Sequence, residues 1–193
     1  MTKFCDFDIK KQLSHPLFVK IRSEHKEIWE IAQNLLSDPY MGNQLLQKLK
    51  GHHLKEERFI FRQIKDHPRL SEGGPMCTYF YDEQIHSPPL SIAKDLLGEE
   101  ILWRDDQQDL VKTSSPLLIP LGEHRAIISL LSFLINRQGD EKLRAKVNRE
   151  LLRILKSNIQ KEENCFFKVC IKLLGYDGLN QADQDWQKNL SIK

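Results

Sequence analysis

Residues 43–65 have the sequence NQLLQKLKGHHLKEERFIFRQIK, and this stretch decides the fold class. Its apolar residues recur every three or four positions, which is the spacing of one face of an α-helix. The same face carries His53 and Glu57, which lie four residues apart and therefore point in one direction. Asp66-His67-Pro68 follows and ends the helix, because the residue before a proline avoids helical geometry. The stretch predicts an amphipathic helix whose apolar stripe is interrupted by an imidazole and a carboxylate.

Three further segments, residues 16–36, 120–137 and 141–174, show the same periodicity. Alternating patterns bounded by hairpin turns, which would indicate strands, are weak throughout the chain. Four amphipathic helices in 193 residues predict an all-α fold, an antiparallel up-down four-helix bundle. We expect one domain over the whole chain, with the bundle at about 15–70 and 117–174.

Residues 71–116 separate the second and third expected helices, which is too long for a structureless loop inside a compact domain. Gly73-Gly74-Pro75 indicates a loop that enters a helix, and a second short helix is expected at 91–97. We therefore predict a partly helical insertion that packs as a flap on the bundle, with its acidic, Gln-rich stretch 99–109 exposed. Residues 175–193 are polar and are predicted to form a loosely docked tail.

The composition narrows the classes of partner. The chain has 29 Lys and Arg against 27 Asp and Glu, a formal net charge of +2, which gives no electrostatic basis for binding nucleic acid or an anionic membrane. Its longest apolar stretches, such as 116–121, are too short to span a bilayer. Residues 1–8 lack the apolar run of a signal peptide, so a cytoplasmic protein is expected. The four cysteines form no Cys-x-x-Cys pair and are expected to be buried free thiols.

The informative feature is that each helical stripe is interrupted by a potential metal ligand or an amide. The interrupting residues are His25, His53, Glu57, His124, Asn158 and Glu162. Burying an unpaired carboxylate costs several kcal/mol, and no Lys or Arg lies on these stripes to balance the charge. A metal ion would balance it directly, and imidazoles with bridging carboxylates suit iron, manganese or zinc. The pattern predicts a metal site in the core of the bundle.

Each of these residues also has an ordinary structural interpretation. A single histidine on an apolar helix face is usually a hydrogen-bonded core residue, and a His/Glu pair four apart is often a surface pair. The register of the second helix is open by one residue, because His52 and Glu56 are also four apart. We prefer His53 and Glu57 because the apolar residues that follow continue their face more regularly.

Five short motifs occur in a fixed order: Glu24-His25, HHLKEERFIF at 52–61, Gly73-Gly74-Pro75, SPLLIPLGEH at 115–124 and NIQKEENCFF at 158–167. Together they resemble the hemerythrin-like, His-His-Glu cation-binding family. The resemblance covers about residues 15–174, and the order and spacing of the motifs carry it more than any one of them. It implies a four-helix bundle that holds a non-haem di-iron centre, with two carboxylates bridging the metal ions.

Carried onto this chain, the resemblance implies that the metal ligands are His25, His53, Glu57, His124 and Glu162. The last histidine of the family pattern falls at Asn158. An amide oxygen is a weak, neutral ligand that prefers harder ions than imidazole does. One metal position is therefore expected to be weak, filled by water or empty, unless His86 in the insertion or Glu123 beside His124 completes it.

Three functions follow from this interpretation. The first is a binding protein whose non-haem iron, mononuclear or di-iron, binds dioxygen or nitric oxide, or which stores or senses iron; manganese and zinc are the other metals considered. The second is a di-iron oxidase, peroxidase or iron–sulfur repair enzyme, for which Cys165 is the one thiol on the face of Asn158. The third is a metal-free bundle that acts as an interaction protein, in which core polar groups hydrogen-bond to one another.

Overall fold

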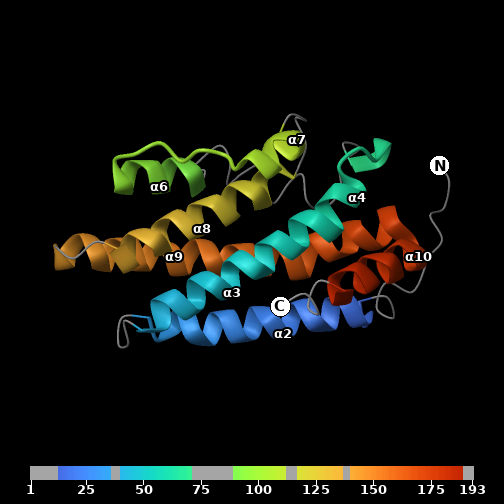
Figure 1. The fold of residues 1–193 in the computed structure, drawn as a ribbon, viewed down its shortest axis with the longest axis horizontal. Coiled ribbons are helices and arrows are strands. Elements are labelled where there is room, and N and C mark those ends of the chain that lie inside the picture. Colours follow the sequence, from blue (N-terminus) through green and yellow to red (C-terminus); the bar gives the residue numbers. More distant parts are fainter. Residues whose placement is uncertain (1–12, 36–39, 71–88, 112–116, 137–139, 189–193) are drawn as a thin grey trace.

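The computed structural model describes residues 13–35, 40–70, 89–111, 117–136 and 140–188, and every regular element within these ranges is helical. The all-α prediction is confirmed. Four long helices lie lengthwise beside one another (Figure 1): α2 (Pro16–Gln33), α3 (Tyr40–Glu56), α8 (Leu118–Asn136) and α9 (Glu141–Lys161). α2 contacts α3, α3 contacts α8, α8 contacts α9 and α9 contacts α2, so the four helices enclose a common core.

Local sequence signals fix where two of these helices begin. At the start of α2, the His15 Nδ1 accepts a hydrogen bond from the backbone N–H of Leu17 at 3.2 Å, and Pro16 occupies the first helical position. At the start of α9, the Asp140 carboxylate accepts a hydrogen bond from the backbone N–H of Lys142 at 2.9 Å. Each cap satisfies a backbone donor that has no partner inside the helix.

Two of the bundle helices continue into a π-helical segment at the centre of the molecule. α3 runs into η1 (Glu57–Phe61) and then α4 (Arg62–Ile64), while α9 runs into η4 (Glu162–Phe166) and then α10 (Phe167–Lys188). Each π segment begins at a buried glutamate. Single π turns inside α-helices are rare and are frequent at functional sites.

Two apolar clusters fill the bundle, and a layer of polar side chains separates them. In α2 the change occurs at His25, between Ile21 of one cluster and Ile28 of the other. The same change occurs along the other three helices, at Glu56, Glu123 and Asn158. The candidate ligands therefore meet at one level of the core, with hydrophobic packing on both sides.

The described part of the insertion packs on the bundle. It contains α6 (Pro89–Leu97), η3 (Asp105–Gln107) and α7 (Gln108–Val111), and α6 lies against α8 (Figure 1). The short helix η2 (Pro68–Leu70) precedes the insertion. The short helix expected at 91–97 is part of α6. The stretch 99–109 is not wholly exposed, because Gln107 is fully buried. The motif Gly73-Gly74-Pro75 and His86 lie outside the described residues.

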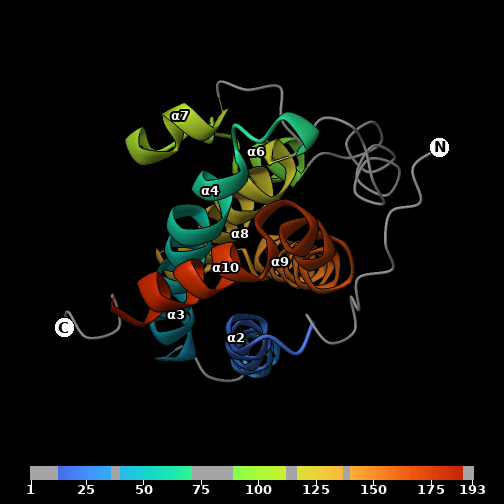
Figure 2. The same ribbon diagram turned by 90° about the vertical axis from the view of Figure 1, so that its right-hand side faces the viewer.

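The C-terminal segment differs from the loose polar tail that its composition predicts. α10 bends at Gly175, whose φ of 63° is readily adopted only by glycine, and then continues as helix to Lys188. Leu179, Ala182 and Trp186 are spaced three and four residues apart and are fully buried. Figure 2 shows this part of α10 crossing the end of the bundle, so it closes one apolar cluster rather than trailing from it.

Within the described ranges, α8 is the one helix that is long and apolar enough to span a membrane by length and composition. Its most apolar window has a mean hydropathy of 1.5, and 61% of that window is buried inside the molecule. Burial against α3, α6 and α9 gives α8 the environment of a core helix. The cytoplasmic location stays a prediction.

Candidate metal centre

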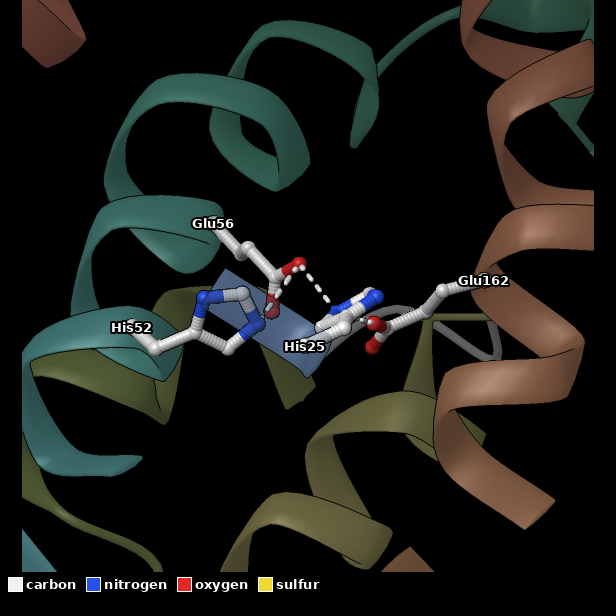
Figure 3. A group of neighbouring side chains, drawn as sticks. All are labelled: His25, His52, Glu56 and Glu162. Atoms are coloured by element: carbon white, nitrogen blue, oxygen red, sulfur yellow. Dashed lines mark ion pairs between the residues drawn. The ribbon is translucent and has the colours of Figure 1, made fainter. Parts of the chain in front are cut away.

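Four buried side chains from three chain segments converge between the two apolar clusters (Figure 3). They are His25 from α2, His52 and Glu56 from α3, and Glu162 at the start of η4. Each offers one ligand atom, and these atoms all lie within 4.8 Å of one another. Two imidazoles and two carboxylates at this spacing could hold a metal ion.

The imidazoles present their Nε2 atoms to the two carboxylates. His25 Nε2 lies 3.0 Å from Glu162 Oε2 and 3.9 Å from Glu56 Oε1, and His52 Nε2 lies 3.4 Å from Glu56 Oε1. A third histidine approaches from α8: His124 Nε2 lies 3.5 Å from Glu56 Oε2 and 3.3 Å from Glu162 Oε1. Each carboxylate thus has one oxygen toward His25 and the other toward His124.

The opposite ring nitrogen of each histidine is held by an outer carboxylate. The Nδ1 atoms of His25, His52 and His124 lie 2.8, 2.8 and 3.0 Å from carboxylate oxygens of Glu163, Glu24 and Glu57 respectively. A proton on Nδ1 is therefore hydrogen-bonded, and Nε2 is the ring nitrogen that faces inward. Metal-binding histidines nearly always have such an outer partner, which fixes the ring orientation and raises the basicity of the ligand.

Several inward-facing atoms make no hydrogen bond of ordinary geometry within the described residues. They are Nε2 of His25 and His52, Oε2 of Glu56 and Oε2 of Glu162. Buried polar atoms are nearly always hydrogen-bonded, and leaving one unsatisfied costs about 1–3 kcal/mol. These atoms belong to the four residues whose ligand atoms lie within 4.8 Å of one another, an arrangement that a bound cation would satisfy.

The electrostatics of the two carboxylates differ although they lie in one layer. Burial raises the pKa of Glu56 well above its ordinary value, and the neighbouring carboxylates of Glu162, Glu24 and Glu57 add to this. Burial acts on Glu162 in the same direction, but the adjacent imidazoles of His124 and His25 outweigh it and hold its pKa well below the ordinary value. Glu56 is therefore the carboxyl that keeps a proton until a cation replaces it.

The pKa values of the three imidazoles also differ. Burial lowers the pKa of His25, but the carboxylates of Glu162 and Glu163 outweigh burial and raise it to about 9. The pKa of His124 is likewise raised to about 9, against burial, by Glu162 and Glu57. Burial lowers the pKa of His52 to about 4, so this ring is neutral at physiological pH and its Nε2 is available as a ligand.

The expected ligands His25 and Glu162 belong to the group of four, and His124 contacts both of its carboxylates. His53 and Glu57 are buried as well, but they lie beside the group. Glu57 bonds to His124 and to Arg104 and Gln107 of the insertion, and the His53 ring stacks on His124 with centroids 3.7 Å apart. The other register of α3, His52 and Glu56, supplies the converging atoms. Metal binding by His53 and Glu57 stays a prediction.

A buried ammonium group lies next to Glu162, so the expectation that the polar layer contains no lysine or arginine is wrong. Lys161 is 1% exposed and pairs with Glu123, which is completely buried. The Asn158 amide donates to Glu162 Oε1 at 2.8 Å and to Glu123 Oε2 at 3.4 Å. Lys161 lies three residues after Asn158, so the helical spacing alone could have placed it on the same face.

No family of known proteins, no curated protein and no solved structure matches this chain. The assignment of the site therefore rests on its own geometry and chemistry.

Proposed function

We propose that this protein is a hemerythrin-like, non-haem iron protein whose site binds or senses dioxygen, nitric oxide or iron. The observation that carries the proposal is the convergence of three Nε2 atoms, each anchored through Nδ1 by a carboxylate, on Glu56 and Glu162. Mixed imidazole and carboxylate ligands suit iron and manganese, and they also suit zinc. The order α2, α3, α8, α9 supports the antiparallel up-down bundle expected from the resemblance.

In this proposal His25, His52, Glu56 and Glu162 hold the metal, and His124 approaches the far oxygens of the two carboxylates. Glu57 orients His124, and His53 packs on its ring. Iron bound here would supply an open coordination position for a diatomic ligand. Aromatic rings surround the layer: Phe167 lies beside His25, Phe61 beside His124, and Trp186 beside His52. An apolar surround of this kind limits the access of water to a site, which would favour reversible binding of a diatomic ligand over oxidation of the metal.

The test is the metal content of the chain after anaerobic loading with iron(II), manganese(II) or zinc(II) and desalting, measured by elemental mass spectrometry. The proposal predicts retained metal and a higher melting temperature, because a ligand that binds only the native state stabilises it. Absorption bands that appear when nitric oxide is added to the iron(II) protein would support the gas-binding part. A chain that retains none of the three metals would contradict the proposal and favour a metal-free interaction protein.

Two matched Glu→Gln variants distinguish between the two possible registers of α3. Glu56→Gln removes a converging oxygen and is expected to abolish metal retention. Glu57→Gln changes the partner of His124 Nδ1, together with the contacts to Arg104 and Gln107, and is expected to weaken binding by about 10–100-fold, as outer-shell substitutions do. The opposite ranking would favour His53 and Glu57 as ligands.

A further inference from the structure

A salt bridge is enclosed in the core on the α8–α9 side of the candidate metal centre. Lys161 and Glu123 are 1% and 0% exposed, and the Lys161 ammonium contacts Glu123 Oε1. A buried ammonium is strongly destabilising unless a carboxylate compensates it. The pair thus places a fixed positive charge in the same polar layer as the candidate ligands.

Asn158 connects this pair to the metal centre. Its amide nitrogen donates to Glu162 Oε1 and to Glu123 Oε2, at 2.8 and 3.4 Å. The two oxygens of Glu162 are consequently unlike. Oε1 already receives the amide and faces His124, whereas Oε2 faces His25 and has no hydrogen bond of ordinary geometry. The side of Glu162 toward His25 is open to a cation, and the other side is already hydrogen-bonded.

The balance of charge also indicates that a cation would bind on the side of Glu162 toward His25. Each of the other carboxylates around the site has its own cation: Glu24 has Lys55, Glu57 has Arg104, Glu123 has Lys161 and Glu163 has Arg22. Among the described carboxylates in contact with the site histidines, this leaves Glu56 and Glu162 without a Lys or Arg partner. Two negative charges match one divalent cation, and a second divalent cation would leave an excess of buried positive charge.

We propose that the site holds a single divalent cation between His25, His52, Glu56 and Glu162, and that the Lys161 ammonium replaces a second one. This inference rests on the proposed metal-binding function and adds its stoichiometry. Lys161, Glu123 and Asn158 are then the residues that determine a mononuclear rather than a dinuclear centre.

The wild-type chain provides the first test. Titration with manganese(II), followed by elemental analysis and electron paramagnetic resonance of the desalted protein, should give one ion per chain with the spectrum of an isolated ion. Two ions per chain, or a spectrum of two coupled ions, would overturn this inference and leave the proposed metal-binding function intact. Absence of any retained metal would overturn the proposed function and this inference with it.

Substitutions test the role of Lys161. Lys161→Met leaves the Glu123 carboxylate without its cation, and metal content should rise twofold, to two ions per chain. In Lys161→Met/Glu123→Gln both charges are removed, so the content should return to one. Lys156→Met, at an exposed position of the same helix, should leave it at one. A folded Lys161→Met variant that retains only one ion would overturn the assigned role, and if that variant does not fold the wild-type spectrum decides.

Discussion

Buried charge is compensated differently on the two sides of Glu162. Toward α8, the Lys161 ammonium and the Asn158 amide satisfy Glu123 and one oxygen of Glu162. Toward α2 and α3, Nε2 of His25 and Nε2 of His52 approach Glu56 Oε1 at 3.9 and 3.4 Å, and neither nitrogen makes an ordinary hydrogen bond within the described residues. The first arrangement has a cation that belongs to the chain, and in the second a bound cation would satisfy the facing atoms. This difference separates a structural polar core from a binding site.

The largest effect is expected from Glu162→Gln, because Glu162 contributes to both sides. The substitution removes the charge that faces His25 while keeping the shape of the side chain. Metal binding should fall by more than the roughly 10–100-fold typical of outer-shell changes, and the desalted protein should contain no metal. Elemental analysis measures this, with Glu150→Gln, a partner of Arg153 near the surface, as the control. Wild-type metal content in Glu162→Gln would remove Glu162 from the ligand set.

Lys161→Met should destabilise the side of Glu162 that faces α8, even when no metal is present. In a chelator, this variant leaves the carboxyl of Glu123 buried without its cation, which costs about 3–5 kcal/mol in the free energy of unfolding. Lys161→Met/Glu123→Gln should recover most of that loss, because no unpaired charge remains. Urea unfolding measures both variants. Equal stability of the single and double variants would show that the pair contributes nothing beyond packing.

Glu24→Gln tests the other side of Glu162, which faces α2 and α3. Glu24 accepts from His52 Nδ1, and these contacts with His52 and Lys55 outweigh burial and lower its pKa to about 2. Losing the carboxylate leaves His52 less firmly oriented and less basic, so metal affinity should fall by about 10–100-fold. Glu27→Gln removes a carboxylate from the same helix that pairs with Lys48 at the surface, and it should change affinity little. Similar losses in both variants would indicate a general charge effect.

Much of the fold could be predicted because helical spacing is a local property. The segments expected at 16–36, 43–65 and 120–137 correspond closely to helices of the structure. The prediction of a loosely docked tail is wrong for a physical reason. Leu179, Ala182 and Trp186 make only a narrow apolar stripe in a polar segment. How much this stripe stabilises the fold depends on the apolar cluster that it covers.

The site was harder to predict because its details depend on contacts between helices. His52 and His53 differ by about 100° around α3, and both are buried, so apolar spacing could not choose between them. The π segment that begins at Glu57 shifts the faces of the helix just after the two glutamates. Helical spacing places Lys161 on the face of Asn158, but lysine is usually exposed, and the pairing with Glu123 on another helix helps to explain its burial.

A pH dependence distinguishes the metal-free form of the site from the metal-bound form. In the metal-free chain the pKa values of His25 and His124 are raised to about 9, from about 6.5 when unfolded. The folded state therefore binds more protons, and the stabilisation, complete below pH about 6.5, is lost as the pH rises through about 9. Each ring contributes at most about 1.4 kcal/mol per pH unit. The raised pKa of Glu56 acts in the same direction.

Urea unfolding in a chelator between pH 6.5 and 9 measures this loss. Bound metal should reduce or reverse it, because the cation needs His25 as a neutral ligand and Glu56 as an ionised one, so binding releases protons and strengthens as pH rises. His67→Gln, at a partly exposed position outside the polar layer, serves as the control and should keep the wild-type profile. A metal-free chain whose stability stays constant or increases toward pH 9 would show that the carboxylates of Glu162 and Glu163 do not hold a proton on His25. His25 would then already be a neutral ligand, and a cation could bind without releasing a proton from it.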